Sequence, residues 1–292
     1  MKVAAENEII SRRMAKTGKS PRANYHTHTT WCDGKDTPEA VVLAAIGKGF
    51  SSIGFSSHSM LPENDEQWVV TPAKAPRYAA DIRALAAKYA GRIRVFCGIE
   101  ADYVPGGATP DRAAYAAMSP DYIIGSVHYA VADDGARVAF DHSPQILADG
   151  LRDHFGGDSE RFVRTYFRQV REMVSRFDFD VVGHLDLVRK FNAKHPFFDE
   201  GAAWYREELV KTADAVAASG RLAEVNTGAI ARGWLDDAYP SPFLRALLRE
   251  RGVRFILSSD AHSADKIDFA FDRFGGCEDF AVPPWEMKGG AK

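Results

Sequence analysis

The chain has 292 residues, of which 46% are hydrophobic, and this is enough for one large α/β barrel or two smaller domains. Its 37 basic and 40 acidic residues nearly balance, so the basic surface typical of nucleic-acid-binding proteins is not expected. The three cysteines are too few for a disulfide framework and lack zinc-finger spacing, which indicates a reducing compartment. No apolar run approaches the ~20 residues that a membrane helix needs.

The start of the chain differs from the rest in its composition. Residues 1–23 carry six basic residues but no continuous apolar segment, which argues against a secretory signal. We therefore expect an N-terminal extension over residues 1–23, a single barrel domain over residues 24–292, and a cytoplasmic protein.

Short apolar segments alternate with helical patterns along the rest of the chain. In chain order, the patterns predict a strand over residues 24–28, a helix over 38–48, a strand over 52–55, a polar loop over 62–76, a helix over 77–90, a strand over 93–99, a short helix over 111–118 and a strand over 122–127. The irregular stretch 129–157 follows, which we interpret as part of a substrate lid. The remaining elements are a helix over 159–177, a strand over 180–183, a helix over 200–219, a strand over 222–225, a helix over 241–251 and a strand over 253–257.

Seven strands that alternate with helices predict parallel pairing with helical crossovers. Polar residues follow every one of these strands, and in barrels the carboxyl ends of the strands form the catalytic face. We therefore predict a closed barrel rather than an open sheet.

The segment His26-Thr27-His28 introduces the candidate functional residues. Two imidazoles in an i, i+2 relation on a strand point to the same face, so they can bind one metal ion. Six of the nine histidines lie at predicted strand ends, together with three carboxylates. The full set comprises His26, His28, Asp33, His58, Glu100, His128, His184, Asp260 and His262.

A set of histidines and carboxylates without cysteine suits zinc, manganese or iron. Nine ligands are too many for one tetrahedral ion and crowded for two, so three divalent ions that share a bridging carboxylate fit the count better. Such a cluster lowers the pKa of a bridging water and neutralises the oxygens of a phosphate ester under attack. The alternative is that each residue is separately structural, which is common for one strand-end residue but not for nine together.

In order and spacing, these residues resemble the PHP (polymerase and histidinol phosphatase) family. The matching segments extend from about residue 24 to residue 275 and fill all nine ligand positions of the family pattern: His26-Thr27-His28 with Asp33, Ser57-His58, Gly98-Ile99-Glu100, Ser126-Val127-His128, Gly183-His184 and Ser259-Asp260-Ala261-His262. The histidinol-phosphatase branch is the most similar, through Glu100-Ala101-Asp102-Tyr103, the run from Gly183 to Phe191, Asn226-Thr227-Gly228 and Phe269-Ala270-Phe271.

The resemblance implies a distorted (β/α)7 barrel, with residues 24–292 as a single PHP-type domain, and three divalent ions (Zn, Mn or Fe). By the same resemblance, one ion is held by His26, His28, Glu100 and Asp260, the second by Glu100, His128 and His184, and the third by Asp33, His58 and His262. The implied reaction is hydrolysis of L-histidinol phosphate to L-histidinol and phosphate, in histidine biosynthesis, by attack of a metal-bridging hydroxide. We expect Glu100, Asp260 and His262 to act in catalysis, and Asp260 or a metal-bound water to protonate the leaving group.

Three basic residues near the strand ends are candidates for binding phosphate oxygens. Arg232 follows the sixth strand, and Arg189 and Lys190 follow the fifth. Each has the alternative role of a solvated loop residue.

Four aromatic residues could wall a pocket for an imidazole ring, although aromatic residues in such loops equally serve packing. They are Trp31, Tyr103, Tyr129 and Phe140. Cys32 lies close to the proposed ligands, and we expect it to be a spectator.

Other functions stay open at this stage. A PHP phosphoesterase acting on a nucleotide or another small phosphate ester needs the same metal ligands. An exonuclease also fits them, but the charge balance counts against it. A non-catalytic module would have degraded ligand positions, and none of the nine is degraded. We therefore expect a small phosphorylated substrate and no nucleic-acid or membrane partner, while the oligomeric state stays open.

Overall fold

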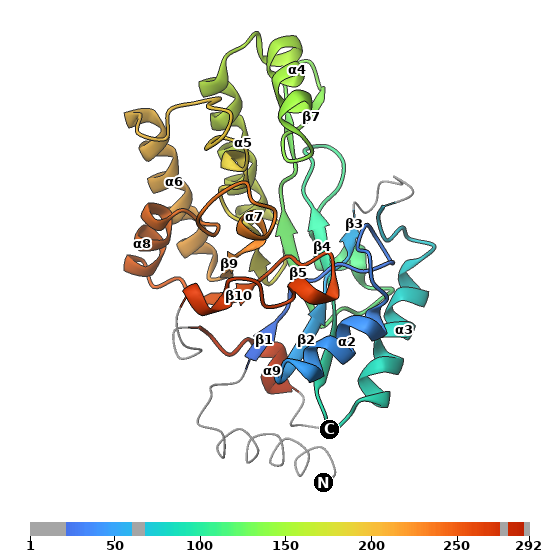
Figure 1. Cartoon of the computed structure of the whole chain (residues 1–292). Coiled ribbons are helices and arrows are strands. Elements are labelled where there is room, and N and C mark those ends of the chain that lie inside the picture. The colour runs from blue at the N-terminus through green and yellow to red at the C-terminus, as the bar shows by residue number, and fades with distance from the viewer. Residues whose placement is uncertain (1–21, 60–67, 275–279, 289–292) are drawn as a thin grey trace.

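The computed structural model describes residues 22–59, 68–274 and 280–288, and its centre is a sheet rolled almost into a barrel (Figure 1). Neighbouring strands follow the order β1 (Arg22–Asn24), β2 (Phe50–Phe55), β4 (Arg94–Asp102), β5 (Tyr122–Ser126), β8 (Val181–Val182), β9 (Leu222–Asn226) and β10 (Phe255–Ser258). The short β3 (His58–Ser59) pairs with β4. Every pair in this sheet is parallel, which confirms the predicted distorted (β/α)7 barrel.

The barrel closes between its first and last strands through the segment that follows β1. Thr27 and Ala261 form an isolated parallel bridge, and the backbone NH of His28 donates to the carbonyl of Ala261 over 2.8 Å. The strand predicted over residues 24–28 therefore has the wrong bounds. Regular pairing ends at Asn24, because its side-chain oxygen accepts the backbone NH of His26 over 3.0 Å and removes that donor from the ladder.

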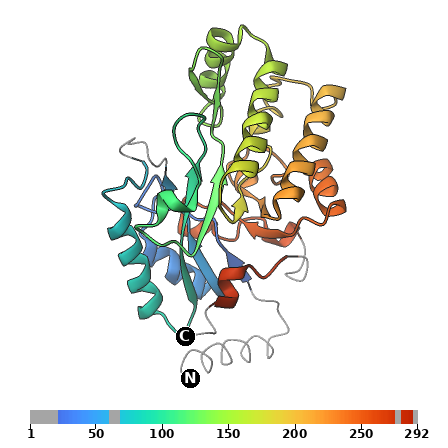
Figure 2. The ribbon, with the colours of Figure 1, turned by 180° about the vertical axis from the view of Figure 1, so that it is seen from behind.

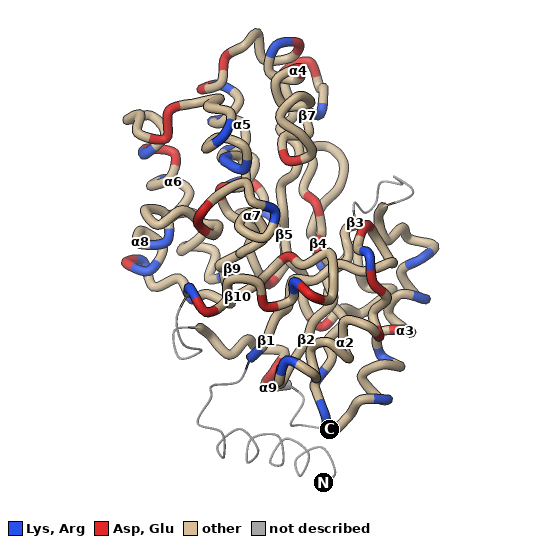
Figure 3. Tube along the Cα trace, viewed as in Figure 1, with Lys and Arg blue, Asp and Glu red and all other residues tan. Residues whose placement is uncertain are grey.

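Helices cover the outside of the barrel (Figures 1 and 2). They are α2 (Pro38–Gly47), α3 (Ala75–Lys88), α5 (Ser159–Arg176), α6 (Ala203–Ser219) and α8 (Pro242–Glu250), with the single turn α7 (Gly228–Ala231) and the short α9 (Pro284–Lys288). Thr37 caps α2 by accepting the NH of Ala40, and Gly220 ends α6 in a left-handed conformation. Figure 3 shows basic and acidic residues interspersed along the outer helices.

Aromatic rings fill the amino-terminal end of the barrel. The rings of Tyr25, Tyr122 and Trp285 pack with centroids 4.7 to 5.9 Å apart. A Cβ atom added at Gly54 or Gly98 would lie 2.3 or 2.2 Å from an atom of Tyr122, so both strands need glycine where this ring crosses them. With this end filled, the carboxyl end of the barrel is left for a site.

The stretch 129–157, predicted to be irregular, is an ordered unit that projects beyond the carboxyl ends of the strands (Figure 1). β6 (Tyr129–Val131) pairs antiparallel with β7 (Arg137–Ala139), and α4 (Pro144–Phe155) follows. The Gln169 side chain of α5 both donates to and accepts from the backbone of β6, each over 2.8 Å. We call residues 129–155 the hairpin unit.

Other predictions differ in extent. The helix predicted over 111–118 is a 3-10 turn, η1 (Arg112–Tyr115). Residues 1–21 of the predicted extension lie outside the described residues, and Arg22 and Ala23 belong to β1. The loop predicted over 62–76 is described from residue 68 onward. In the described part of the chain, every helix is too short or too polar to span a bilayer.

Candidate metal centre

The barrel brings all nine predicted ligands to the carboxyl ends of its strands. Parallel strands that enter a barrel in turn direct their following residues to the same face. The segment after β1 supplies His26, His28 and Asp33, β3 supplies His58, β4 supplies Glu100, the ends of β5 and β8 are followed by His128 and His184, and β10 is followed by Asp260 and His262.

Glu100 occupies the centre of this cluster and is 1% exposed. Five histidine nitrogens lie within 3.5 Å of its two carboxylate oxygens: those of His26, His28 and His58 near Oε2, and those of His128 and His184 near Oε1. The shortest separations are 2.8 Å to His184 Nε2 and 2.9 Å to His58 Nδ1. Both oxygens of one carboxylate thus face several imidazoles.

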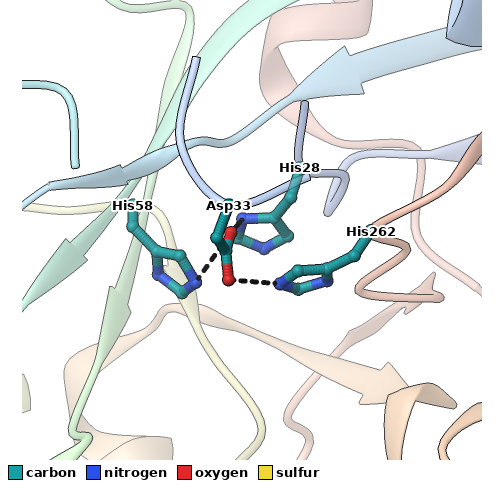
Figure 4. Close-up of side chains that lie close together, drawn as sticks. All are labelled: His28, Asp33, His58 and His262. Atoms are coloured by element: carbon teal, nitrogen blue, oxygen red, sulfur yellow. Dashed lines mark hydrogen bonds and ion pairs between the residues drawn. The ribbon is translucent and has the colours of Figure 1, made fainter. Parts of the chain in front are cut away.

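Asp33 faces three imidazoles at the edge of the cluster, two of which, His28 and His58, also face Glu100 (Figure 4). Its Oδ2 lies 3.1 Å from His262 Nε2, and its Oδ1 lies 3.8 Å from both His28 Nδ1 and His58 Nε2. The ligand atoms of these four residues all lie within 4.8 Å of one another. This spacing allows them to share one ion.

Three other groups of ligand atoms meet the same 4.8 Å limit. They are His26, His28 and Asp260; His26, Glu100 and His184; and His58, Glu100 and His128. The first contains three of the four residues expected around one ion, and the Asp33 group contains all three expected around another. His128 and His184, expected to share an ion with Glu100, fall instead in separate groups within the described residues.

The buried donor atoms of the cluster suit a metal ion. His26 Nε2, His28 Nε2, His58 Nδ1 and Glu100 Oε2 are buried, and within the described part of the chain they make no hydrogen bond of regular geometry. The three nitrogens instead converge on Glu100 Oε2 at 2.9 to 3.5 Å, an arrangement that an ion bound between them would satisfy. Nitrogen and oxygen donors without thiolate suit a divalent ion such as zinc.

Charges within the cluster shift its pKa values. Burial lowers the pKa of His58 and His128, but carboxylates, above all Glu100 for His58 and Asp102 for His128, raise both to about 9. Burial and two neighbouring histidines lower the pKa of His28 to about 3. Burial raises the pKa of Glu100, yet the surrounding histidines hold it well below its usual range. Glu100 is therefore a carboxylate, and a metal ion must displace protons from His58 and His128.

Two buried carboxylates outside the predicted ligand set orient the histidines. Glu224 in β9 lies 2.9 Å from His26 Nδ1 and accepts the backbone NH of His184 over 2.7 Å. Asp102 at the end of β4 bonds to His128 Nδ1. A carboxylate on Nδ1 fixes the ring so that Nε2 faces Glu100, where it could ligate an ion. The signal for Glu224 was available, because a charged residue interrupts the apolar strand predicted over 222–225.

Above the cluster lies a pocket of about 220 Å³, lined outside the ligand set by Asp141, His142, Leu187, Lys190, Arg232 and Tyr239. Arg232 lies 3.2 Å from Asp260 Oδ1 and donates to His262 Nδ1 over 2.9 Å. Lys190 donates to the backbone carbonyl of Asp141 over 2.6 Å. Two of the three predicted phosphate-binding residues therefore face this pocket.

Arg189 does not line it. Its Nε donates to Glu200 over 2.9 Å. Residues 187–190 form the 3-10 turn η2 (Leu187–Arg189) and its cap, and the turn directs neighbouring side chains apart. Lys190 therefore reaches the pocket, while Arg189 points to Glu200.

The four aromatic residues expected to wall the pocket lie elsewhere. Tyr103 and Phe140 belong to the buried core, Trp31 packs against the ring of Tyr78, and Tyr129 packs beside Val104 and Ala108. Tyr239, which was not among them, does line the pocket. Cys32 Sγ lies 3.5 Å from His28 Nδ1, and burial together with Asp33 raises the pKa of its thiol to about 11, so it is protonated.

The fold is a parallel barrel, and its cluster of histidine and carboxylate ligands lies beneath a pocket lined by cationic side chains. Together these features define a metal-dependent hydrolase. The chain belongs to the PHP domain family, which matches residues 24–228.

Individual relatives agree with this assignment. A protein of Deinococcus radiodurans described as a probable histidinol-phosphatase is 34% identical over 251 residues, or 84% of this chain and 88% of its own. The crystal structure of HisK from Listeria monocytogenes matches with a TM-score of 0.77 and 21% identity, over 87% of this chain and 100% of its own. Histidinol phosphate phosphatase from Lactococcus lactis, solved with zinc, L-histidinol and phosphate, matches with a TM-score of 0.65 and 21% identity, over 92% and 94%. At these identities the two structures establish the fold.

Proposed function

We propose that this protein is a metal-dependent phosphomonoesterase that hydrolyses L-histidinol phosphate to L-histidinol and phosphate, a step of histidine biosynthesis. The observation that carries the proposal is the position of Glu100, which faces five imidazoles beneath a pocket lined by Arg232 and Lys190. Divalent ions beside two cationic side chains suit a phosphate dianion. The name of the Deinococcus relative and the ligands of the Lactococcus enzyme support the choice of substrate.

We further propose that the cluster holds three divalent ions, zinc, manganese or iron. The sets are those implied by the family resemblance: His26, His28, Glu100 and Asp260; Glu100, His128 and His184; and Asp33, His58 and His262. When bound, the ions supply a nucleophilic water at neutral pH and neutralise charge on the phosphate. Glu100 and His26 each belong to two different groups of close ligand atoms. This supports a cluster of more than one ion.

The side chains around the ions orient the substrate and influence how the leaving alkoxide is protonated. We assign the binding of phosphate oxygens to Arg232 and Lys190. Arg232 is held in place by Asp260 and Lys190 by the carbonyl of Asp141, so both cations are positioned before the substrate binds. The departing alkoxide needs a proton. Burial raises the pKa of Asp260, but Arg232 and nearby histidines hold it well below its usual range, so Asp260 suits ligation better than proton donation. A water molecule is then the donor, because His262 accepts a hydrogen bond from Arg232 at Nδ1 and its Nε2 faces the Asp33 group.

Phosphate release from the metal-loaded protein tests this function. L-Histidinol phosphate should be hydrolysed with a kcat/KM at least about tenfold above that for a nucleoside monophosphate or a sugar phosphate. Equal rates on all esters, or a preference for the nucleotide, would leave the metal centre in place and overturn the substrate. A metal-loaded protein that hydrolyses none of them would favour a binding module.

A further inference from the structure

One carboxylate of the pocket has no place in phosphate hydrolysis. Asp141 lies in the loop between β7 and α4 and faces the pocket, with 27% of its side chain exposed. The other three carboxylates that line the pocket, Asp33, Glu100 and Asp260, belong to the predicted metal ligands. A fourth negative charge repels a phosphate dianion, so Asp141 needs another role.

The contacts of Asp141 leave one of its oxygens available. Lys190 Nζ makes its short bond, 2.6 Å, to the backbone carbonyl of Asp141, and lies 3.5 Å from the side-chain Oδ2. Within the described residues, Asp141 Oδ1 makes no hydrogen bond or ion pair. Lys190 is thus positioned mainly by the backbone, and Asp141, which lines the pocket, has a free acceptor on its side chain.

We propose that Asp141 determines specificity by binding the ammonium group of the substrate. The inference rests on the proposed function and narrows the substrate class to phosphate monoesters with a primary ammonium on the carbon next to the ester carbon. In L-histidinol phosphate that ammonium lies close to the phosphate, so a carboxylate beside the phosphate-binding Lys190 is well placed to accept its hydrogen bonds. An ester without the ammonium leaves the second oxygen of Asp141 without a partner in the pocket, which penalises its binding.

The variant Asp141→Asn tests the proposal, because asparagine keeps the shape and the backbone carbonyl that anchors Lys190. Two substrates are compared: L-histidinol phosphate and its analogue with hydrogen in place of the amino group. For the amine substrate, kcat/KM should fall about 10- to 100-fold, mainly through KM. For the analogue it should not fall and should rise slightly, because the variant removes the charge that disfavours an ester without the ammonium, and its turnover also shows that the variant is folded and metal-loaded.

Asp133→Asn provides the matched control, since Asp133 lies in the turn of the same hairpin unit with 78% of its side chain exposed. It should leave both substrates unaffected. Equal losses on both substrates in Asp141→Asn would mean that Asp141 acts only through Lys190. Unchanged values on both would mean that Asp141 does not contact substrate. Either result overturns this inference and leaves the proposed function in place. A wild-type protein that does not hydrolyse L-histidinol phosphate would instead overturn the proposed function, and the inference with it.

Discussion

Glu100 and Asp141 line the same pocket, but the protein holds the two carboxylates in different ways. Glu100 lies within β4, is 1% exposed and faces five imidazoles. Asp141 lies in a loop of the hairpin unit, is partly exposed and has one ionic partner, Lys190. A central strand is fixed by the strands on both sides, whereas a loop can change without disturbing the sheet. The comparison indicates that strand ends set the reaction and the hairpin unit sets the substrate.

The variant Glu100→Gln tests the strand-end half of this comparison and should have the largest effect. Glutamine removes the charge that all five histidines share. Since loss of an orienting group alone costs about 10- to 100-fold in metal affinity or activity, loss of a direct ligand should lower kcat by more than about 100-fold. Bound metal, measured by elemental analysis, should fall as well. The matched control is Glu207→Gln on the exposed face of α6, and full activity with full metal content in Glu100→Gln would remove Glu100 from the centre.

The variant Glu224→Gln tests how strongly metal affinity at the strand ends depends on a residue that does not contact the substrate. Glutamine keeps the size but loses the charge that holds His26 Nδ1. Metal affinity, measured by competition with a chromophoric chelator, should weaken about 10- to 100-fold. Activity should recover at high metal concentration, because the ligands themselves are intact. An unchanged metal affinity would show that Glu224 serves only the backbone of His184.

The variant Arg232→Lys tests a pocket residue that contacts the metal ligands at the strand ends and is proposed to bind the substrate. Lysine keeps the charge but loses the two-pronged guanidinium that contacts Asp260 and His262. We expect kcat/KM to fall about tenfold. The same exchange at the exposed Arg206 of α6 should have no effect. Wild-type kinetics in Arg232→Lys would mean that the phosphate relies on the ions alone.

The variant Arg189→Gln should have the smallest effect on catalysis. Arg189 pairs with Glu200 and does not line the pocket, so KM should change less than about twofold. Loss of the largely buried pair should instead lower the unfolding free energy by about 1–3 kcal/mol, which thermal denaturation measures. A tenfold rise in KM with unchanged stability would place Arg189 at the substrate after all.

The strand-end region could be predicted from the sequence because its signals are local. Each ligand follows a recognisable apolar segment, and a parallel barrel brings such ends together without further information. The orientation of each ring could not be predicted in the same way. It depends on partners far along the chain, such as Glu224 for His26 and Asp102 for His128, and the expected sharing of one ion by Glu100, His128 and His184 stays a prediction.

The hairpin unit was misread although parts of its pattern were present. Asp134-Gly135 is a typical hairpin turn, and Ser143-Pro144 with Gly156 marks the two ends of α4. Its two strands are only three residues each, too short for a clear alternation of apolar and polar residues. The position of Asp141 depends on how this unit packs against α5 through Gln169, and that contact has no signature in the local sequence.

The most direct test of the account is anomalous diffraction from a crystal of the metal-loaded protein. We predict three peaks at the carboxyl ends of the barrel strands, with Glu100 between two of them and Asp33 beside the third. A single peak, or peaks away from Glu100, would contradict the proposed centre and the mechanism built on it.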